Sequence, residues 1–116
     1  MKYVLGIDIG TTAIKGAIIG EDGKVYGSKT SEYTLTTLPT GEVEAELQLY
    51  IDAFESSVKG ALVDADVDKV DVKCVGFSST AETCVFLDKE NHPLCKVIAW
   101  MDTRATKEAE YLSTRF

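Results

Sequence analysis

The sequence predicts an α/β fold in which a small sheet is followed by a crossover helix and a further strand. Three observations support this prediction. Apolar and polar side chains alternate with a period of two through much of the first 36 residues, as they do in half-buried strands. Residues 44–63 change to the spacing of an amphipathic helix. A new apolar run begins at Val72, and the order strand, helix, strand implies a right-handed crossover to a parallel strand.

The composition is that of a folded, acidic domain. The chain has 116 residues, of which 45% are hydrophobic, and 12 Lys plus Arg oppose 19 Asp plus Glu for a net charge of −7. The apolar content excludes a disordered tail, and the length by itself predicts one domain. Because Lys and Arg are needed to neutralise phosphates, the acidic balance argues against a nucleic-acid partner.

Targeting signals and metal motifs are not evident. No apolar run approaches the roughly 18 residues that span a bilayer, and the N-terminus lacks the apolar core of a signal peptide. We therefore expect no membrane partner and a cytoplasmic location. Cys74, Cys84 and Cys95 form no C-x-x-C pair and are interpreted as reduced thiols packed as small hydrophobic side chains, rather than as a metal or redox site.

The first three strands are expected to form an antiparallel meander, over residues 3–9, 13–19 and 24–36. A polar break at Gly10 to Thr12 separates the first two strands. The Asp22-Gly23 step supplies the positive φ angles that a tight hairpin turn needs.

The helix is expected over residues 44–63. Its apolar side chains recur at spacings of four and three, which places them on one face: Leu47, Ile51, Phe54, Val58 and Ala61. Three acidic residues near its start, Glu42, Glu44 and Glu46, suit the positive end of the helix dipole. A polar linker over residues 64–71 follows.

The remaining elements are a parallel strand, an inserted hairpin and a final helix. The strand is expected over residues 72–77, and the hairpin over 83–87 and 96–100 around a charged turn. Asp102 or Thr103 is expected to cap a helix that runs towards Phe116.

A candidate phosphate site lies between the first two strands. Asp8 stands at the end of an apolar strand, and Gly10, Thr11 and Thr12 form the turn that follows. Such a turn offers backbone N–H groups and hydroxyls to a phosphate, a carboxylate can hold Mg²⁺ directly or through water, and Lys15 adds a cation from the second strand. The alternative is a plain β-hairpin with a surface lysine, and the turn is not a Walker loop, because G-x-x-x-x-G-K is absent.

Residues 6–12 with Ile14 and Lys15 resemble the first phosphate-binding hairpin of the ATPase superfamily that contains sugar kinases, Hsp70 and actin. Two later segments are similar to the FGGY carbohydrate kinases: residues 75–88, and residues 96–104 with a W-x-D-x-R pattern. The acidic residues 42–46 resemble that family more loosely. The resemblance spans the chain and implies a partial RNase H-like (actin-like ATPase) fold.

The resemblance also implies roles for individual residues. Asp8 would position Mg-ATP and be the magnesium ligand, while Gly10, Thr11 and Thr12 would lie near the transferred phosphate, with Lys15 at a basic or polar position. The sugar pocket would be lined by residues of two segments: Thr80, Ala81, Glu82, Trp100, Asp102 and Arg104. Because glycerol kinases have Glu and xylulokinases have His at the position of Glu82, and neither has Ala at the position of Ala81, the substrate stays open.

Structural alternatives stand beside these roles. Trp100 would otherwise be a core residue, Asp102 and Arg104 a helix cap with a surface pair, and Glu82 a solvated loop acid. A non-catalytic actin-like or Hsp70-like module is the competing function. An RNase H-like nuclease would need several metal carboxylates on adjacent strands, and only Asp8 is suitably placed.

The resemblance further implies that residues 1–116 are the N-terminal portion of the first of two kinase domains. In the family the general base is an Asp much later in the first domain, so no catalytic base is expected in this chain. The full-length protein would transfer the γ-phosphoryl group of ATP, with Mg²⁺, to a small sugar or polyol, whereas the isolated chain would be inactive. An uncovered sheet edge predicts self-association of the isolated chain, and the full-length protein is a candidate homodimer.

Overall fold

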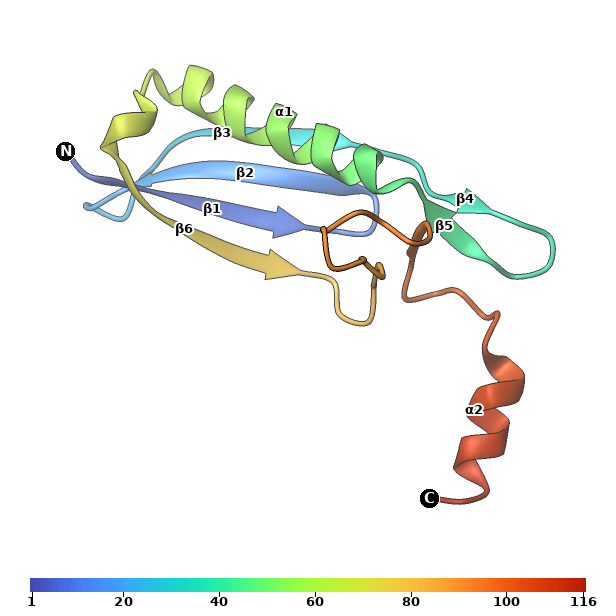
Figure 1. Ribbon diagram of the computed structural model, residues 1–116. Helices are drawn as coiled ribbons and strands as arrows, with labels where there is room; N and C mark the ends of the chain where they lie inside the picture. Colours follow the sequence, from blue (N-terminus) through green and yellow to red (C-terminus); the bar gives the residue numbers. More distant parts are fainter. The chain divides into compact units, whose positions relative to one another are not determined.

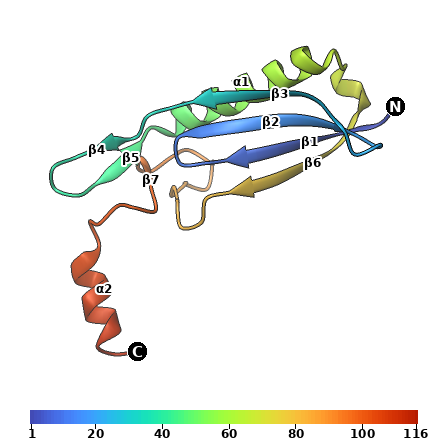
Figure 2. The same cartoon turned by 180° about the vertical axis from the view of Figure 1, so that it is seen from behind.

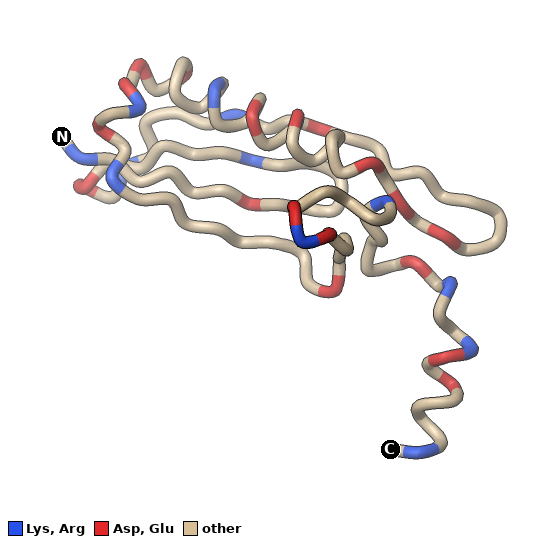
Figure 3. The backbone as a smooth tube through the Cα atoms, viewed as in Figure 1, with Lys and Arg blue, Asp and Glu red and all other residues tan.

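The computed structural model describes residues 1–116 as two units. The first unit comprises Met1–Thr34 and Gln48–Thr80, and the second comprises Leu35–Leu47 and Ala81–Phe116. Lys and Arg are interspersed with Asp and Glu along both units (Figure 3). No helix is long and apolar enough to cross a bilayer.

A four-stranded mixed sheet forms the centre of the first unit (Figure 1). Its strands are β1 (Tyr3–Ile9), β2 (Ala13–Gly20), β3 (Val25–Glu32) and β6 (Val72–Ser79), in the order β3-β2-β1-β6. β2 is antiparallel to β1 and to β3, whereas β6 is parallel to β1. The predicted meander and the parallel strand after the crossover are confirmed.

Helix α1 (Leu47–Ala65) provides the crossover and covers one face of this sheet (Figures 1 and 2). The sheet presents four buried apolar side chains from β1 and β2 to it: Leu5, Ile7, Ile14 and Ile18. The helix begins three residues later than predicted because Glu44 and its neighbours belong to a strand. Its first turn contains no acidic residue; of the three acidic residues expected at the helix start, only Glu46 directly precedes the helix, whereas Glu44 belongs to a strand.

The contact between α1 and the sheet uses small side chains. The buried residues of the helix are Ala53, Ser57 and Ala61, whereas Ile51, from the predicted stripe, is 42% exposed. A Cβ placed on Gly16 of β2 would lie 2.9 Å from the carbonyl oxygen of Ser57. The helix backbone therefore lies too close to the sheet for large side chains to fit between them. The side of the helix that faces the sheet is the one that carries the small residues Ala53, Ser57 and Ala61.

The polar linker after α1 contains one short 3₁₀ helix, η1 (Lys69–Asp71). The side chain of Asp68 caps it by accepting a hydrogen bond of 3.0 Å from the N–H of Val70. At the other end of β6, the N–H of Thr80 donates to the carbonyl of Ile9 at 2.9 Å. This bond continues the parallel pairing beyond the strands and ties the end of β6 to the end of β1.

The second unit contains a small antiparallel sheet that the sequence did not predict. Its strands are β4 (Thr36–Thr37), β5 (Val43–Ala45) and β7 (Val97–Ile98), in the order β4-β5-β7 (Figure 2). The third predicted strand was too long, because β3 ends at Glu32 and the chain starts a new strand at Thr36. β5 pairs on one side with β4, in a short local hairpin, and on the other with β7, which lies some fifty residues later in the chain.

The predicted hairpin over residues 83–100 is mostly irregular. Apart from β7, it is represented by two isolated bridges, Cys84 with Ile98 and Leu87 with Pro93. Helix α2 (Thr106–Ser113) follows, but the residue at its N-cap is Ala105, which makes no side-chain cap. The prediction that Asp102 or Thr103 caps this helix was wrong.

All three cysteines are free and exposed. The expectation that Cys74, Cys84 and Cys95 pack as small hydrophobic side chains was therefore wrong, although they form no disulfide. No group of three or more His, Cys, Asp or Glu side chains is placed to hold a metal ion.

Candidate functional site

The carboxyl ends of β1 and β6 meet at one edge of the first unit's sheet. In the strand register Asp8 of β1 is opposite Lys15 of β2 on one side and Ser78 of β6 on the other. Because side chains alternate along a strand, these three lie on the face opposite the buried Ile7, away from α1. Ligands of open α/β sheets bind at the carboxyl ends of strands, which makes this edge the first candidate site.

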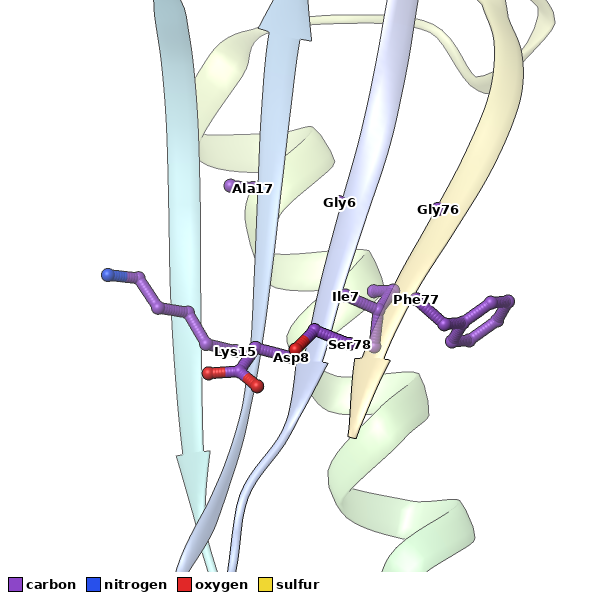
Figure 4. A pocket seen from close by; sticks show the side chains of 8 residues that line it. All are labelled: Gly6, Ile7, Asp8, Lys15, Ala17, Gly76, Phe77 and Ser78. Carbon is purple, nitrogen blue, oxygen red and sulfur yellow. The ribbon is translucent and has the colours of Figure 1, made fainter. Parts of the chain in front are cut away.

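A hollow of about 390 Å³ lies on this open face (Figure 4). Two glycines, Gly6 and Gly76, are paired across β1 and β6, so no side chains fill the hollow at this point. A Cβ at Gly76 would meet nothing within 4 Å. The hollow is lined by Gly6, Ile7, Asp8, Lys15, Ala17, Gly76, Phe77 and Ser78.

Asp8 and Lys15 are the two charged groups of the hollow. Both side chains are exposed and project from neighbouring strands (Figure 4), and neither has an ion-pair or hydrogen-bond partner within the chain. A carboxylate is a hard oxygen ligand for Mg²⁺, and an ammonium group attracts phosphate oxygens. The pair therefore fits a Mg²⁺-phosphate group. With only one protein carboxylate, the remaining ligands of such an ion would be waters and phosphate oxygens, as is usual for Mg²⁺.

The turn at Gly10, Thr11 and Thr12, here called the phosphate loop, follows β1 directly. The N–H of Gly10 donates to the carbonyl of Ala13 at 2.9 Å, which closes the turn. Tyr33 binds the loop from beyond the end of β3: its N–H donates to the carbonyl of Thr12 at 2.9 Å, and its hydroxyl donates to the carbonyl of Gly10. Sequence reasoning missed Tyr33, because no local pattern connects a tyrosine near the end of the third strand to a turn after the first.

The second group of predicted site residues lies at the start of the loop after β6 and in the second unit. Glu82 is exposed and has a φ of 62°, in the left-handed region that residues other than glycine seldom adopt. Such a backbone conformation is retained where the surroundings hold it, and it is frequent at functional sites. Its neighbours Thr80 and Ala81 are half-buried and exposed, respectively.

Trp100 is not a core residue in this chain. It is 53% exposed, and its backbone N–H donates to the hydroxyl of Thr83 at 3.2 Å. This bond holds the tryptophan backbone to the segment just after Glu82. The half-exposed indole leaves an apolar surface accessible to a ligand.

Asp102, Arg104 and Glu44 form one hydrogen-bonded ion network in the second unit. Arg104 donates to Asp102 through Nε at 2.9 and 3.0 Å and through Nη2 at 2.7 Å, and the same Nη2 lies 2.9 Å from Glu44. Lys96 adds a second cation 3.4 Å from Glu44. The predicted pairing of Asp102 with Arg104 is present, and Glu44, expected at a helix start, is its third member.

The network fixes the charge of its acidic members. Hydrogen bonds from Arg104 hold the pKa of Asp102 well below its usual range, and the same guanidinium lowers the pKa of Glu44. The two carboxylates raise the pKa of Arg104 in turn. The side chain of Asp102 is only 3% exposed, and its oxygens also accept hydrogen bonds from the backbone N–H groups of Val43 at 2.7 Å and Arg104 at 2.9 Å. Its lone pairs are therefore used largely within the protein.

Comparison with known proteins matches nearly the whole chain to one family. The model of the FGGY family of carbohydrate kinases, N-terminal domain, matches residues 3–116. The chain is 33% identical over 115 residues to a xylulose kinase of Lactococcus lactis and 30% identical over 112 residues to a glycerol kinase of Enterococcus faecalis. These matches cover 99% and 96% of the chain but only 23% and 22% of the relatives.

A solved structure shows the same fold. The ligand-bound xylulose kinase of Lactobacillus acidophilus superimposes with a TM-score of 0.88 at 26% identity, over 99% of this chain and 23% of that one. The mixed sheet, the crossover helix and the inserted small sheet are thus those of the actin-like ATPase N-terminal domain. The chain spans about a quarter of the length of the relatives that it matches.

Proposed function

Because the chain belongs to the FGGY family of carbohydrate kinases, we propose that the protein carrying it transfers the γ-phosphoryl group of ATP to a hydroxyl of a small sugar or polyol. One observation supports the assignment most directly: the unpaired Asp8 and Lys15 stand side by side at the end of β1, next to the phosphate loop. In phosphoryl transfer the protein contributes positioning and charge stabilisation rather than covalent chemistry, and these groups supply both.

In this proposal the first unit binds the nucleotide phosphates. Asp8 holds Mg²⁺, directly or through water, and the ion neutralises charge on the phosphate oxygens. Lys15 provides a second positive charge on the same face of the sheet. The backbone and hydroxyl groups of the phosphate loop orient the transferred group, because N–H dipoles in such turns attract anions.

The acceptor is assigned to the loop after β6 and to the second unit. Thr80, Ala81 and Glu82 line the pocket, with Glu82 accepting hydrogen bonds from substrate hydroxyls, and Trp100 offers its half-exposed ring to the sugar carbons. Asp102 and Arg104 contribute to the same site. Since the bonds of Asp102 are directed largely to Arg104 and Val43, we assign this pair to holding the Trp100 segment in place.

The general base is assigned to the part of the protein beyond residue 116, since residues 1–116 form the N-terminal portion of the first kinase domain in this proposal. The isolated chain would then be inactive. It would also self-associate, because β6 has a free edge and its Phe77 is 63% exposed. A cytoplasmic location, with the full-length protein as a homodimer, completes the proposal.

The deciding experiment is a coupled assay of ADP formation by the product of the complete reading frame. Ketoses, polyols and aldonates are offered in turn with ATP and Mg²⁺, and one class should be phosphorylated. At a Mg²⁺ concentration that is just sufficient for the wild type, the Asp8→Asn variant should lose most of this activity, while the exposed turn variant Glu90→Gln should keep it. Binding of Mg-ATP with no transfer to any acceptor would instead indicate a non-catalytic nucleotide-binding module.

A further inference from the structure

Tyr33 binds both ends of the phosphate loop. Its backbone N–H and its side-chain hydroxyl donate to two different carbonyls, those of Thr12 and Gly10. One residue, located after β3, thus restrains the first and the last peptide of the turn between β1 and β2. The N–H bond to Thr12 continues the antiparallel pairing of β2 and β3 by one residue, whereas the hydroxyl bond to Gly10 lies outside any strand pairing.

We propose that Tyr33 is a positioning residue for phosphoryl transfer, which holds the phosphate loop in the conformation that receives the nucleotide phosphates. The inference rests on the proposed function, and it adds a residue outside the hollow and outside the loop itself. Tyr33 acts through the loop and does not touch the nucleotide.

The physical reason is the geometry of the peptide group. In a trans peptide the C=O and the N–H point in opposite directions. The carbonyl of Gly10 and the N–H of Thr11 belong to the same peptide, so the bond from the Tyr33 hydroxyl directs that N–H to the side of the loop away from Tyr33. A carbonyl turned towards a phosphate would repel it, whereas an N–H attracts it. Tyr33 therefore stabilises the orientation that suits an anion.

Tyr33 is itself held rigidly. It is 7% exposed, and its ring packs against that of Tyr50 on α1 with 4.8 Å between the centroids. Burial raises the pKa of Tyr33 to about 12, and the electrostatic interaction and hydrogen bond with the Tyr50 side chain add to the shift. The hydroxyl therefore remains a protonated donor throughout the neutral range. Helix α1 is thus connected to the loop through two packed aromatic rings.

A matched control, Tyr26, lies at the opposite end of β3 from Tyr33. The hydroxyl of Tyr26 donates to the exposed Asp22 at 3.0 Å, in the turn between β2 and β3. That turn is at the opposite end of the strands from the phosphate loop. Tyr26→Phe removes one tyrosine hydroxyl and one hydrogen bond without touching the loop.

The test compares Tyr33→Phe with Tyr26→Phe in the full-length protein. We expect Tyr33→Phe to raise the KM for ATP and the calorimetric Kd for Mg-ADP by roughly three- to tenfold, the size of one neutral hydrogen bond, and to lower kcat. The KM for the acceptor should not change, and Tyr26→Phe should leave all four quantities unchanged. An unchanged Kd for Mg-ADP, or equal rises in both KM values, would overturn the proposal.

The two measurements separate this inference from the proposed function. A wild-type protein that binds Mg-ADP but phosphorylates no acceptor refutes the kinase assignment, and the Kd comparison still decides the role of Tyr33. Should Tyr33→Phe fail to fold, Tyr50→Leu keeps the Tyr33 hydroxyl but removes both the ring packed against Tyr33 and the Tyr50 hydroxyl beside it. We then expect Tyr50→Leu to raise the KM for ATP and the Kd for Mg-ADP, by less than Tyr33→Phe would, with no change in the KM for the acceptor. The absence of this rise refutes the inference.

Discussion

The carboxylate of Asp102 accepts a hydrogen bond of 2.7 Å from the backbone N–H of Val43, which lies 59 residues earlier in the chain. This bond joins β5 to the segment that carries Trp100. It also explains why Asp102 does not cap α2, because both of its oxygens are directed to Val43 and Arg104.

Replacing this carboxylate should loosen the Trp100 segment. Asp102→Asn removes the charge paired with Arg104, so we expect the local opening free energy to fall by about 2 kcal/mol, as for hydrogen bonds to charged groups. Hydrogen exchange at the Val43 amide should accelerate by roughly thirtyfold. The control Asp52→Asn alters an exposed i,i+4 pair on α1 and should leave this amide unchanged. Unaltered protection of Val43 in Asp102→Asn would contradict the assigned role.

The same network predicts a dependence of stability on acid. The folded-state pKa values of Asp102 and Glu44 lie below the ordinary values of 3.8 and 4.5, so the stabilisation from these two carboxylates is fully present above about pH 5. It is lost as the pH falls through those ordinary values towards the lowered ones, because the unfolded state takes up protons first. Val43 exchange, referenced to an unstructured peptide between pH 7 and pH 3, should show this loss, and Asp102→Asn should flatten it. A wild-type profile that is flat over this range would argue against the network.

The close approach of α1 to β2 predicts opposite outcomes for two glycines. Gly16→Ala places a methyl group 2.9 Å from the carbonyl oxygen of Ser57, so a loss of about 1–3 kcal/mol in the free energy of unfolding is expected. Gly76→Ala, on β6, adds a methyl group with nothing within 4 Å. It should be neutral or stabilise by up to about 1 kcal/mol, since it reduces the entropy of the unfolded chain. Urea unfolding of both variants provides the comparison, and equal losses would show that helix packing is not the cause.

Magnesium dependence tests the role of Asp8. In the full-length protein, Asp8→Asn keeps the size of the side chain but weakens its hold on the cation. The Mg²⁺ concentration for half-maximal rate should rise by about 10–100-fold, the range found when groups around a metal are altered. Asp22→Asn, in the turn between β2 and β3, serves as the control and should retain the wild-type Mg²⁺ curve. If both variants behave alike, Asp8 does not hold the ion.

Glu82 should affect binding of the acceptor and not binding of the nucleotide. Glu82→Gln weakens charge-assisted hydrogen bonds to substrate hydroxyls, which predicts a rise of about tenfold or more in the acceptor KM. The KM for ATP should stay the same. The exposed hairpin-turn variant Glu90→Gln should change neither value. A rise confined to the ATP KM would place Glu82 on the nucleotide side instead.

The parts of the fold that the sequence predicted correctly are those governed by local patterns. β1 and β2 alternate buried and exposed residues because only one face of the sheet is covered by α1, and their predicted bounds were right to within one residue. The order strand, helix, strand was sufficient to predict that β6 is parallel to β1. Asp8, Lys15 and the phosphate loop lie within one short hairpin, as expected, and their role as a site stays a prediction.

Most of the errors have non-local causes. The pairing of β5 with β7 joins residues some fifty positions apart, although the short hairpin of β5 with β4 is local and was also missed. The buried face of the helix was predicted incorrectly because Gly16, on β2, allows the small residues of α1 to approach the sheet closely. Tyr33 and the Asp102–Val43 bond were missed because each joins residues far apart in the sequence.

The parallel pairing of β1 with β6 also determines when the sheet can be completed while the chain is being synthesised. About 70 residues separate the two strands, so β1 has no neighbour on that side until residue 79 has left the ribosome. Hairpins such as β1–β2–β3 form in about 1–10 μs, whereas the 5–20 residues per second of translation need roughly 2–10 s to pass from the end of β3 to the end of β6. During those seconds the β1 edge is a template for other strands. The last strand of the sheet, and not its first hairpin, therefore determines how long the nascent chain is exposed to mispairing.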